Sequence, residues 1–243
     1  EPTEELYAGN SGTTARRMLG ILAGATISSV ILTGDESLSV RPMNRVTKPL
    51  HAMRASIASE HDGNLLPLKI EAGSLTAIDY TNPVASAQVK SAILFAGLHA
   101  EGTTIVREKT ISRDHTEQML SHFGANVHSN NGEISITGGG SLNGTDVHVP
   151  GDISSAAFFM VAAGLVKDSS ITFKNLGLNP TRSVILDVLR NMGVDVNVMN
   201  ESTEGGERSG NVTIAYNKIL PTEISGSLIP RLIDELPIIA LLA

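Results

Sequence analysis

The chain has 243 residues, of which 41% are hydrophobic and 18% are charged. This balance is typical of a globular protein with one large or two modest domains, and it excludes a generally disordered chain. The net charge is −7, and the aromatic residues are only 5 Phe and 3 Tyr. A polyanion would be repelled and would find few stacking partners, so we expect no nucleic acid partner.

Cysteine is absent, so the chain has no disulfide, thiolate metal site or cysteine nucleophile. No apolar run reaches the roughly 18 residues that a membrane span needs, and no basic segment followed by an apolar one opens the sequence. We therefore expect a cytoplasmic protein. The sequence begins without Met and stops inside an apolar helical pattern at 238–243, which predicts an internal fragment of a longer protein.

A repeated pattern organises the chain. Each copy predicts a helix of small apolar residues, a strand that starts with Ser or Thr, an amphipathic helix and alternating strands. The predicted small-residue helices are 13–25, 86–100 and 154–166, and the strands that follow them are 28–32, 103–107 and 169–173. The predicted amphipathic helices are 46–57, 116–123 and 183–192. The later strands are 126–128, 133–136, 195–198 and 211–214, and a fourth copy begins at Asp234.

The small-residue helices are apolar all round, so we expect them to be buried on all sides. This predicts an α/β fold of repeated units with inward helices. Residues 138–151 are rich in Gly and turn residues, which places a domain boundary near residue 148. The predicted domains are therefore 1–147 and 148–243, both of them incomplete.

Small polar or acidic residues stand just before each apolar helix. They are Asn10-Ser11-Gly12-Thr13-Thr14, Ser86-Ala87-Gln88, Asp152-Ile153-Ser154-Ser155 and Asp234-Glu235. Helix N-termini carry unsatisfied N–H groups and a partial positive charge, so they can bind phosphate or carboxylate. Each residue taken singly could equally be an ordinary helix cap, Asp234 included. Their recurrence in one repeat series favours a shared anion site.

Arginines in the following loops could supply the cations of that site. Arg41 precedes a proline, which should hold it outside the next helix, and Arg113 and Arg182 occupy related loops of the later copies. Guanidinium groups suit carboxylate and phosphate, although each could also be a solvated loop charge. The histidines lack metal-ligand spacing, so we assign no metal.

Six motifs in this order resemble the 3-phosphoshikimate 1-carboxyvinyltransferase (EPSP synthase) family, and most resemble its bacterial subgroup. They are Asn10-Ser11-Gly12-Thr13-Thr14-Ala15-Arg16, Arg41-Pro42-Met43-Asn44-Arg45-Val46, Val84-Ala85-Ser86-Ala87-Gln88-Val89-Lys90-Ser91-Ala92, Ser112-Arg113-Asp114-His115-Thr116-Glu117, Pro150-Gly151-Asp152-Ile153-Ser154-Ser155-Ala156 and Ile233-Asp234-Glu235-Leu236-Pro237. The resemblance implies a two-domain, inside-out α/β barrel of βαβαββ units. It also implies that segments at both ends which contact substrate are missing here, so the chain alone should be inactive or nearly so.

The implied reaction joins phosphoenolpyruvate to the 5-hydroxyl of shikimate 3-phosphate and releases phosphate, with no redox cofactor, as a step of aromatic amino acid biosynthesis. The resemblance also implies a glyphosate target, although Arg17 stands where an apolar residue or proline is expected.

The implied roles are divided between the two substrates. Gly12 and Arg41 would hold phosphoenolpyruvate, and Ser86, Ala87 and Arg113 would hold the phosphate of shikimate 3-phosphate. Gln88 would touch both substrates, and Asp234 would accept the proton of the 5-hydroxyl. The same motif as Gly12 adds Asn10 and Thr13 as substrate-binding residues.

Two alternatives remain at this point. UDP-N-acetylglucosamine enolpyruvyl transferase shares the repeat and the phosphoenolpyruvate chemistry, but it typically uses a mobile-loop cysteine, which this sequence lacks. A non-catalytic scaffold built from repeats would need an inward basic channel if it bound nucleic acid. We expect a monomer whose partners are the two small substrates.

Overall fold

The computed structural model describes residues 5–26, 28–59, 64–71 and 73–242. The chain divides into two compact units, Glu1–Gly144 and Thr145–Ala243. The division falls a few residues before the boundary expected near 148. Within the described ranges, no helix is long and apolar enough to cross a membrane.

The first unit contains two copies of one βαβαββ motif. The first copy consists of β1 (Leu6–Tyr7), α1 (Gly12–Gly24), β2 (Ser29–Thr33), α3 (Asn44–Ala52), β3 (Ser56–Ala58) and β4 (Leu68–Glu71), with the short helix α2 (Glu36–Ser39) inserted after β2. The second copy consists of β5 (Asp79–Asn82), α4 (Ala87–Gly97), β6 (Thr103–Glu108), α5 (His115–His122), β7 (Val127–Asn130) and β8 (Glu133–Thr137). The strand orders β1-β2-β4-β3 and β5-β6-β8-β7 are equivalent, and in each sheet only the first pair of strands is parallel.

The second unit contains the third copy. Its elements are α6 (Ile153–Leu165), β9 (Ser170–Gly177), α7 (Val184–Asn191), β10 (Asp195–Glu204), β11 (Glu207–Ala215), the 3-10 helix η1 (Gly226–Arg231) and α8 (Leu236–Ile239). The sheet order β9-β11-β10 matches the order of the last three strands in the earlier copies, and a parallel bridge from Gly151 to Leu176 stands in for the first strand. The predicted repeat is confirmed.

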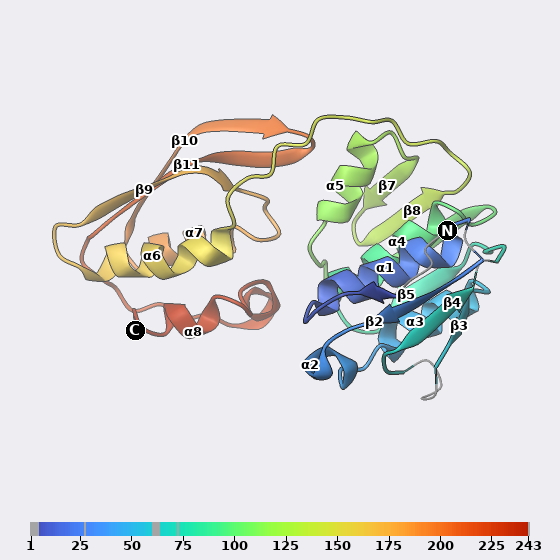
Figure 1. Ribbon diagram of the computed structural model, residues 1–243. Helices are drawn as coiled ribbons and strands as arrows, with labels where there is room; N and C mark the ends of the chain where they lie inside the picture. The colour runs from blue at the N-terminus through green and yellow to red at the C-terminus, as the bar shows by residue number, and fades with distance from the viewer. Residues whose placement is uncertain (1–4, 27, 60–63, 72, 243) are drawn as a thin grey trace. The chain divides into compact units, whose positions relative to one another are not determined.

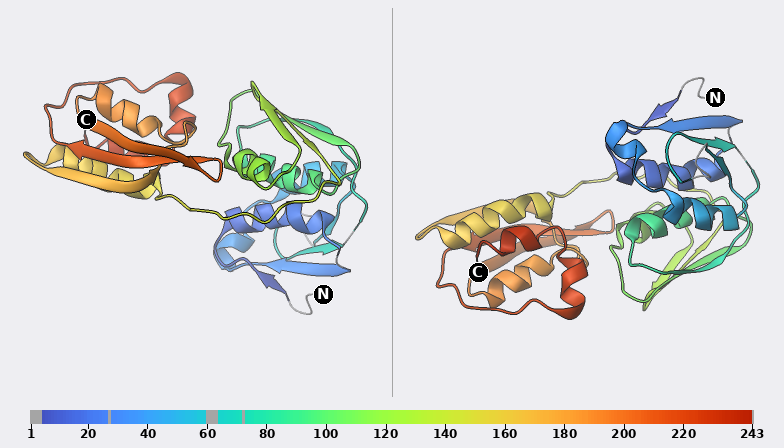
Figure 2. Two further views of the ribbon diagram at one scale, coloured as in Figure 1. Left: turned by 90° about the horizontal axis from the view of Figure 1, so that it is seen from above. Right: turned by 90° about the horizontal axis from the view of Figure 1, so that it is seen from below.

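In the first unit the helices lie in the interior and the two sheets form the outer layers. Helix α1 contacts the first sheet and α4 contacts the second, and the two helices pack against each other (Figures 1 and 2). They cross so closely that a Cβ atom on Gly20 would lie 2.1 Å from the carbonyl oxygen of Ala92. A side chain at position 20 would therefore push the helices apart.

Three details of the sequence-based expectation are wrong. The helix expected over 46–57 ends at Ala52, because Arg54 adopts φ 68° and turns the chain into β3. Burial on all sides holds best for α4, whereas Phe158 and Phe159 of α6 are 59% and 61% exposed. The helix expected to continue to 243 is the four-residue α8, and residue 243 lies outside the described residues.

Candidate functional site

The start of α1 gathers an asparagine and an arginine around a buried glycine. Ser11 caps the helix by accepting a hydrogen bond from the backbone N–H of Thr14, and Gly12 opens it. Arg41, which lies outside α3 as expected, donates from Nη2 to Asn10 Oδ1 at 2.8 Å and to Ser37 Oγ at 2.9 Å. The Asn10 amide in turn donates to Asp35 at 2.7 Å. The amide is thus fixed from both sides and orients the guanidinium of Arg41.

Gln88 links α4 to α1. Its Nε2 donates to Thr13 Oγ1 at 2.9 Å, and its Oε1 accepts from Arg16 Nη1 at 2.8 Å. Arg16 also donates to the carbonyl oxygen of Pro42 at 3.2 Å. Residues that are 72 or 75 positions apart in the sequence therefore meet at one helix-start cluster. A Cβ atom on Gly12 would lie 3.0 Å from Arg16 Nη1, so glycine leaves room for that guanidinium.

Like charges crowd this cluster. Partial burial lowers the pKa of Arg16, and the charges of Arg45 and Arg41 lower it further. The pKa of Asp35 is held below its usual range by hydrogen bonds from Asn10 and from the backbone of Leu38. An anion placed here would relieve the repulsion among the guanidinium groups, so the α1 start has the electrostatics of an anion site.

The start of α4 and the loop before α5 form a second group. Ser86 caps α4 through the backbone N–H of Val89, and Ala87 is the first residue of the helix. Arg113 lies in the loop between β6 and α5, partly buried. Burial lowers the pKa of Arg17, and the charge of Arg113 lowers it further. This second group therefore also concentrates positive charge.

Asp234 lies in the second unit, in the turn before α8, and its side chain is exposed. The structure does not support its reading as a helix cap, because the cap position belongs to Glu235, whose side chain makes no hydrogen bond to the first turn of α8. Glu235 is 2% exposed and accepts a short hydrogen bond from the hydroxyl of Ser154. Arg182 donates to Ser154 Oγ at 2.6 Å and pairs with Asp152 at 2.8 Å.

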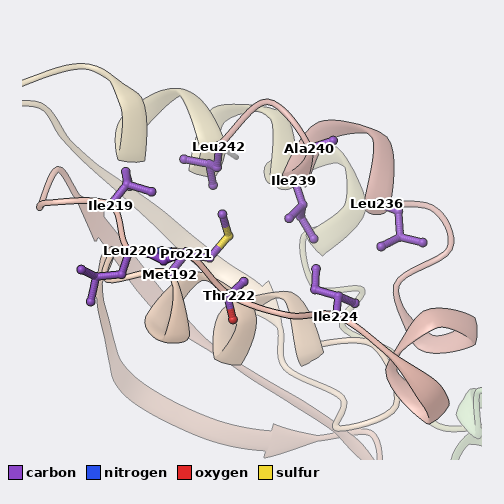
Figure 3. A pocket seen from close by; sticks show the side chains of 10 residues that line it. All are labelled: Met192, Ile219, Leu220, Pro221, Thr222, Ile224, Leu236, Ile239, Ala240 and Leu242. Atoms are coloured by element: carbon purple, nitrogen blue, oxygen red, sulfur yellow. The ribbon is translucent and has the colours of Figure 1, made fainter.

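A pocket of about 540 Å³ also lies in the second unit (Figure 3). Its lining residues are Met192, Ile219, Leu220, Pro221, Thr222, Ile224, Leu236, Ile239, Ala240 and Leu242. The hydroxyl of Thr222 is the one polar side-chain group among them. Such a lining offers no charge to a phosphorylated substrate, so we do not assign the reaction to this pocket.

Sequence reasoning gave no role to two residues that the structure makes prominent, Arg16 and Lys90, which lie inside motifs that were singled out. Glu235 was grouped with Asp234 as a helix cap or anion-site residue, whereas the structure buries it against Ser154. A single charged residue in a helix that is mostly apolar is the signal that could have identified Lys90. Among the described residues, no group of three or more His, Cys, Asp or Glu side chains could hold a metal ion.

Comparison with known proteins gives consistent matches. The family model for EPSP synthase (3-phosphoshikimate 1-carboxyvinyltransferase) matches residues 1–243. The 3-phosphoshikimate 1-carboxyvinyltransferases of Geobacillus kaustophilus and Bacillus subtilis are 55% and 53% identical over the whole chain, which covers 57% and 56% of their lengths. An EPSP synthase structure from Acinetobacter baumannii is 43% identical with a TM-score of 0.92, and the chain covers 55% of it. The chain thus spans about half the length of the relatives it matches.

Proposed function

Because this chain belongs to the EPSP synthase (3-phosphoshikimate 1-carboxyvinyltransferase) family, we propose that it supplies substrate-binding and catalytic groups for enolpyruvyl transfer. In this reaction phosphoenolpyruvate and shikimate 3-phosphate give 5-enolpyruvylshikimate 3-phosphate and phosphate. The main support for this proposal is the family match over residues 1–243, which includes every motif that contributes to the proposed site. The relatives are longer, so the activity belongs to a protein of their full length that contains these residues.

Phosphoenolpyruvate is proposed to bind at the start of α1. Arg41 offers a guanidinium that Asn10 orients at 2.8 Å, and Gly12 leaves room for the guanidinium of Arg16 beside the helix start. Thr13 lies in the first turn beside Gln88. Crowded arginines stabilise an anionic substrate, and they stabilise still more the charge that develops as phosphate leaves.

Shikimate 3-phosphate is proposed to bind at the start of α4. Ser86, the first-turn N–H groups of the helix and Arg113 provide donors for its phosphate, which suits a helix N-terminus. Gln88 contacts residues of α1 while it belongs to α4. That link supports its assignment to both substrates, because it ties the two helix starts together.

Asp234 is proposed to accept the proton of the 5-hydroxyl. As the oxygen adds to C2 of the enolpyruvyl group, C3 takes up a proton and a tetrahedral intermediate forms. Loss of a proton and of phosphate then restores the enol ether, so protons balance over the two steps. The exposure of Asp234, beside the buried Glu235, supports a carboxylate that meets substrate rather than the protein interior.

The test is phosphate release by a protein of the relatives' full length that contains this chain, given phosphoenolpyruvate and one acceptor. We expect release with shikimate 3-phosphate and none with UDP-N-acetylglucosamine. Release only with the UDP-sugar would assign the other enolpyruvyl transfer. A protein that binds DNA and turns over neither acceptor would support a scaffold instead.

The assembly and location of the protein are also proposed. We propose that it acts as a cytoplasmic monomer on its two small substrates, without nucleic acid. The negative net charge of −7 supports the lack of a polyanionic partner. Light scattering of the full-length protein would contradict a monomer if it gave a dimer mass at assay concentration.

A further inference from the structure

Lys90 is the one charged residue of α4 and lies in its interior. It is the fourth residue after the cap Ser86, and only 1% of its surface is exposed. The corresponding residues after the caps Ser11 and Asp152 are Ala15 and Ala156, both buried. The fold therefore does not require lysine at this position. Burying an ammonium group is costly unless it is paired, so an alanine-like residue would be the simpler solution for packing alone.

Two buried carboxylates pair with Lys90. Its Nζ lies 3.0 Å from Glu108 Oε2 and 2.7 Å from Glu117 Oε1. Glu108 is the last residue of β6 and Glu117 lies in the first turn of α5. One lysine thus joins α4 to the strand and the helix that flank the loop carrying Arg113.

Glu108 also holds that loop directly. It accepts a hydrogen bond from the Ser112 hydroxyl at 2.6 Å and another from the Ser112 backbone N–H at 3.2 Å. Ser112 immediately precedes Arg113. A carboxylate that accepts from both groups of one residue fixes the direction of the backbone at that point.

The topology explains why fixing this loop matters at the start of α4. In the parallel pair β5 and β6, Asn82 and Glu108 are register partners at the carboxyl ends of their strands. The turn from Asn82 leads to Ser86, and the loop from Glu108 leads to Arg113. Asn82 also donates to the carbonyl oxygen of Ser86 at 3.4 Å. Both connections therefore begin at the same sheet edge, and each is anchored by a buried polar side chain.

We propose that Lys90 and Glu108 are positioning residues that fix Arg113 relative to the start of α4, and so shape the site for the phosphate of shikimate 3-phosphate. This inference rests on the proposed function. Lys90 sets the place of the Glu108 carboxylate, Glu108 sets the place of Ser112, and Ser112 determines where the Arg113 backbone begins. The first turn of α4 carries Ser86, Ala87 and Gln88 on the same helix as Lys90.

A pair of matched serine variants separates positioning from stability. Ser112→Ala removes the 2.6 Å hydroxyl contact to Glu108, which ties the loop. Ser91→Ala removes an equally short 2.6 Å contact to Thr116, which ties α4 to α5 without involving the loop. Lys90→Met is the third variant, in which a side chain of similar length replaces the charge. All are made in the full-length enzyme that contains this chain.

We expect Ser112→Ala to raise the KM for shikimate 3-phosphate about 10-fold while the KM for phosphoenolpyruvate changes less than about 2-fold. Ser91→Ala should leave both KM values near those of the wild type, even if both serine variants lower Tm similarly. Lys90→Met, if it folds, should show the Ser112→Ala pattern more strongly. Calorimetric titration with shikimate 3-phosphate checks that KM follows binding.

The failure of this inference differs from the failure of the proposed function. Wild-type enzyme that neither binds shikimate 3-phosphate nor releases phosphate would overturn both. Normal wild-type turnover with equal KM changes in the two serine variants, or none in either, would reduce the Lys90 network to a structural element and leave the proposed function standing.

Discussion

The starts of α1 and α4 occupy the same place in two copies of one motif, yet the cation within each helix, Arg16 or Lys90, has partners of a different kind. At α1, Arg16 and Arg41 donate to uncharged oxygens, and partial burial, together with the charges of Arg45 and Arg41, lowers the pKa of Arg16. At α4, Lys90 lies between two buried carboxylates. Cations that lack full compensation can bind an anion, whereas a compensated cation holds neighbouring elements in place.

The start of α6 shows a third arrangement. Arg182 pairs with Asp152 and also donates to Ser154, which reaches the buried Glu235. Burial raises the pKa of Asp152, but hydrogen bonds from Ser155 and the charge of Arg182 together hold it below its ordinary value. The repeat thus keeps its backbone plan while each copy distributes charge differently.

The largest expected effect contrasts the neighbouring carboxylates Asp234 and Glu235. Asp234→Asn in the full-length enzyme should lower kcat by roughly 10²–10⁴, because the proposed proton acceptor is lost. Glu235→Gln should lower Tm and change kcat by less than about 10-fold, since Glu235 is buried against Ser154. Steady-state turnover and melting curves of both variants check this. A normal kcat for Asp234→Asn would remove Asp234 from the mechanism.

The next effect tests whether uncharged side chains can replace the buried lysine and its two carboxylates. Lys90→Met removes one partner from a buried network, so the free energy of unfolding should fall by about 3–5 kcal/mol. The triple variant Lys90→Met, Glu108→Gln, Glu117→Gln removes all three charges and should recover most of that loss. Urea unfolding measures both. If the triple variant were no more stable than the single one, uncompensated charge would not be the cause.

Substitution of two arginines tests whether the start of α1 binds phosphoenolpyruvate and the start of α4 binds shikimate 3-phosphate. Arg41→Ala should raise the KM for phosphoenolpyruvate by about 10- to 100-fold, which corresponds to a charge-assisted contact of about 1.5–3 kcal/mol, and it should affect shikimate 3-phosphate less. Arg113→Ala should show the reverse preference. Initial rates with each substrate varied in turn decide the matter. Equal losses for both substrates in both variants would contradict the assignment of sides.

The sequence predicts the fold well wherever periodicity survives. Apolar and polar residues alternate in strand β8, which predicted the strand, and the structure buries Ile134 and Ile136 as that alternation requires. Strand β5, Asp-Tyr-Thr-Asn, lacks an apolar pattern and becomes a strand because β6 pairs with it. The helix predicted over 46–57 was too long for a local reason. Met53 and Ala55 continue the apolar pattern of α3, but Arg54 turns the backbone.

The site was predicted less completely than the fold. Local motifs identify Arg41 and Gln88, but the partners of Gln88 lie 72 and 75 residues away. The charge of Lys90 is visible in an apolar stretch, whereas its pairing with Glu108 and Glu117 depends on how strands and helices meet. Pairing across elements is decided by tertiary packing, which periodicity in one sequence does not encode.

The smallest expected effect concerns Glu117, the second of the two carboxylates that pair with the single charge of Lys90. Burial raises the pKa of Glu117 above its ordinary value near 4.5, although Lys90 acts in the opposite direction. Between the unfolded and the folded pKa, the native state binds more protons than the unfolded state does, so stability falls as pH rises through that window. Glu117→Gln removes this titration. The stability of the variant relative to wild type should therefore increase as pH rises from about 4 and then level off above the folded pKa.

Urea unfolding at a series of pH values, in parallel for wild type and Glu117→Gln, measures this difference. Glu101→Gln serves as the control, because it removes one exposed carboxylate from the same unit. This control leaves the buried network unchanged. It measures how the loss of one negative charge alone changes the stability of a chain whose net charge is −7. If the stability of Glu117→Gln relative to wild type instead falls as pH rises, Lys90 outweighs burial at Glu117. Glu117 would then be a stabilising partner of the lysine, and both carboxylates would be needed to balance the one cation of α4.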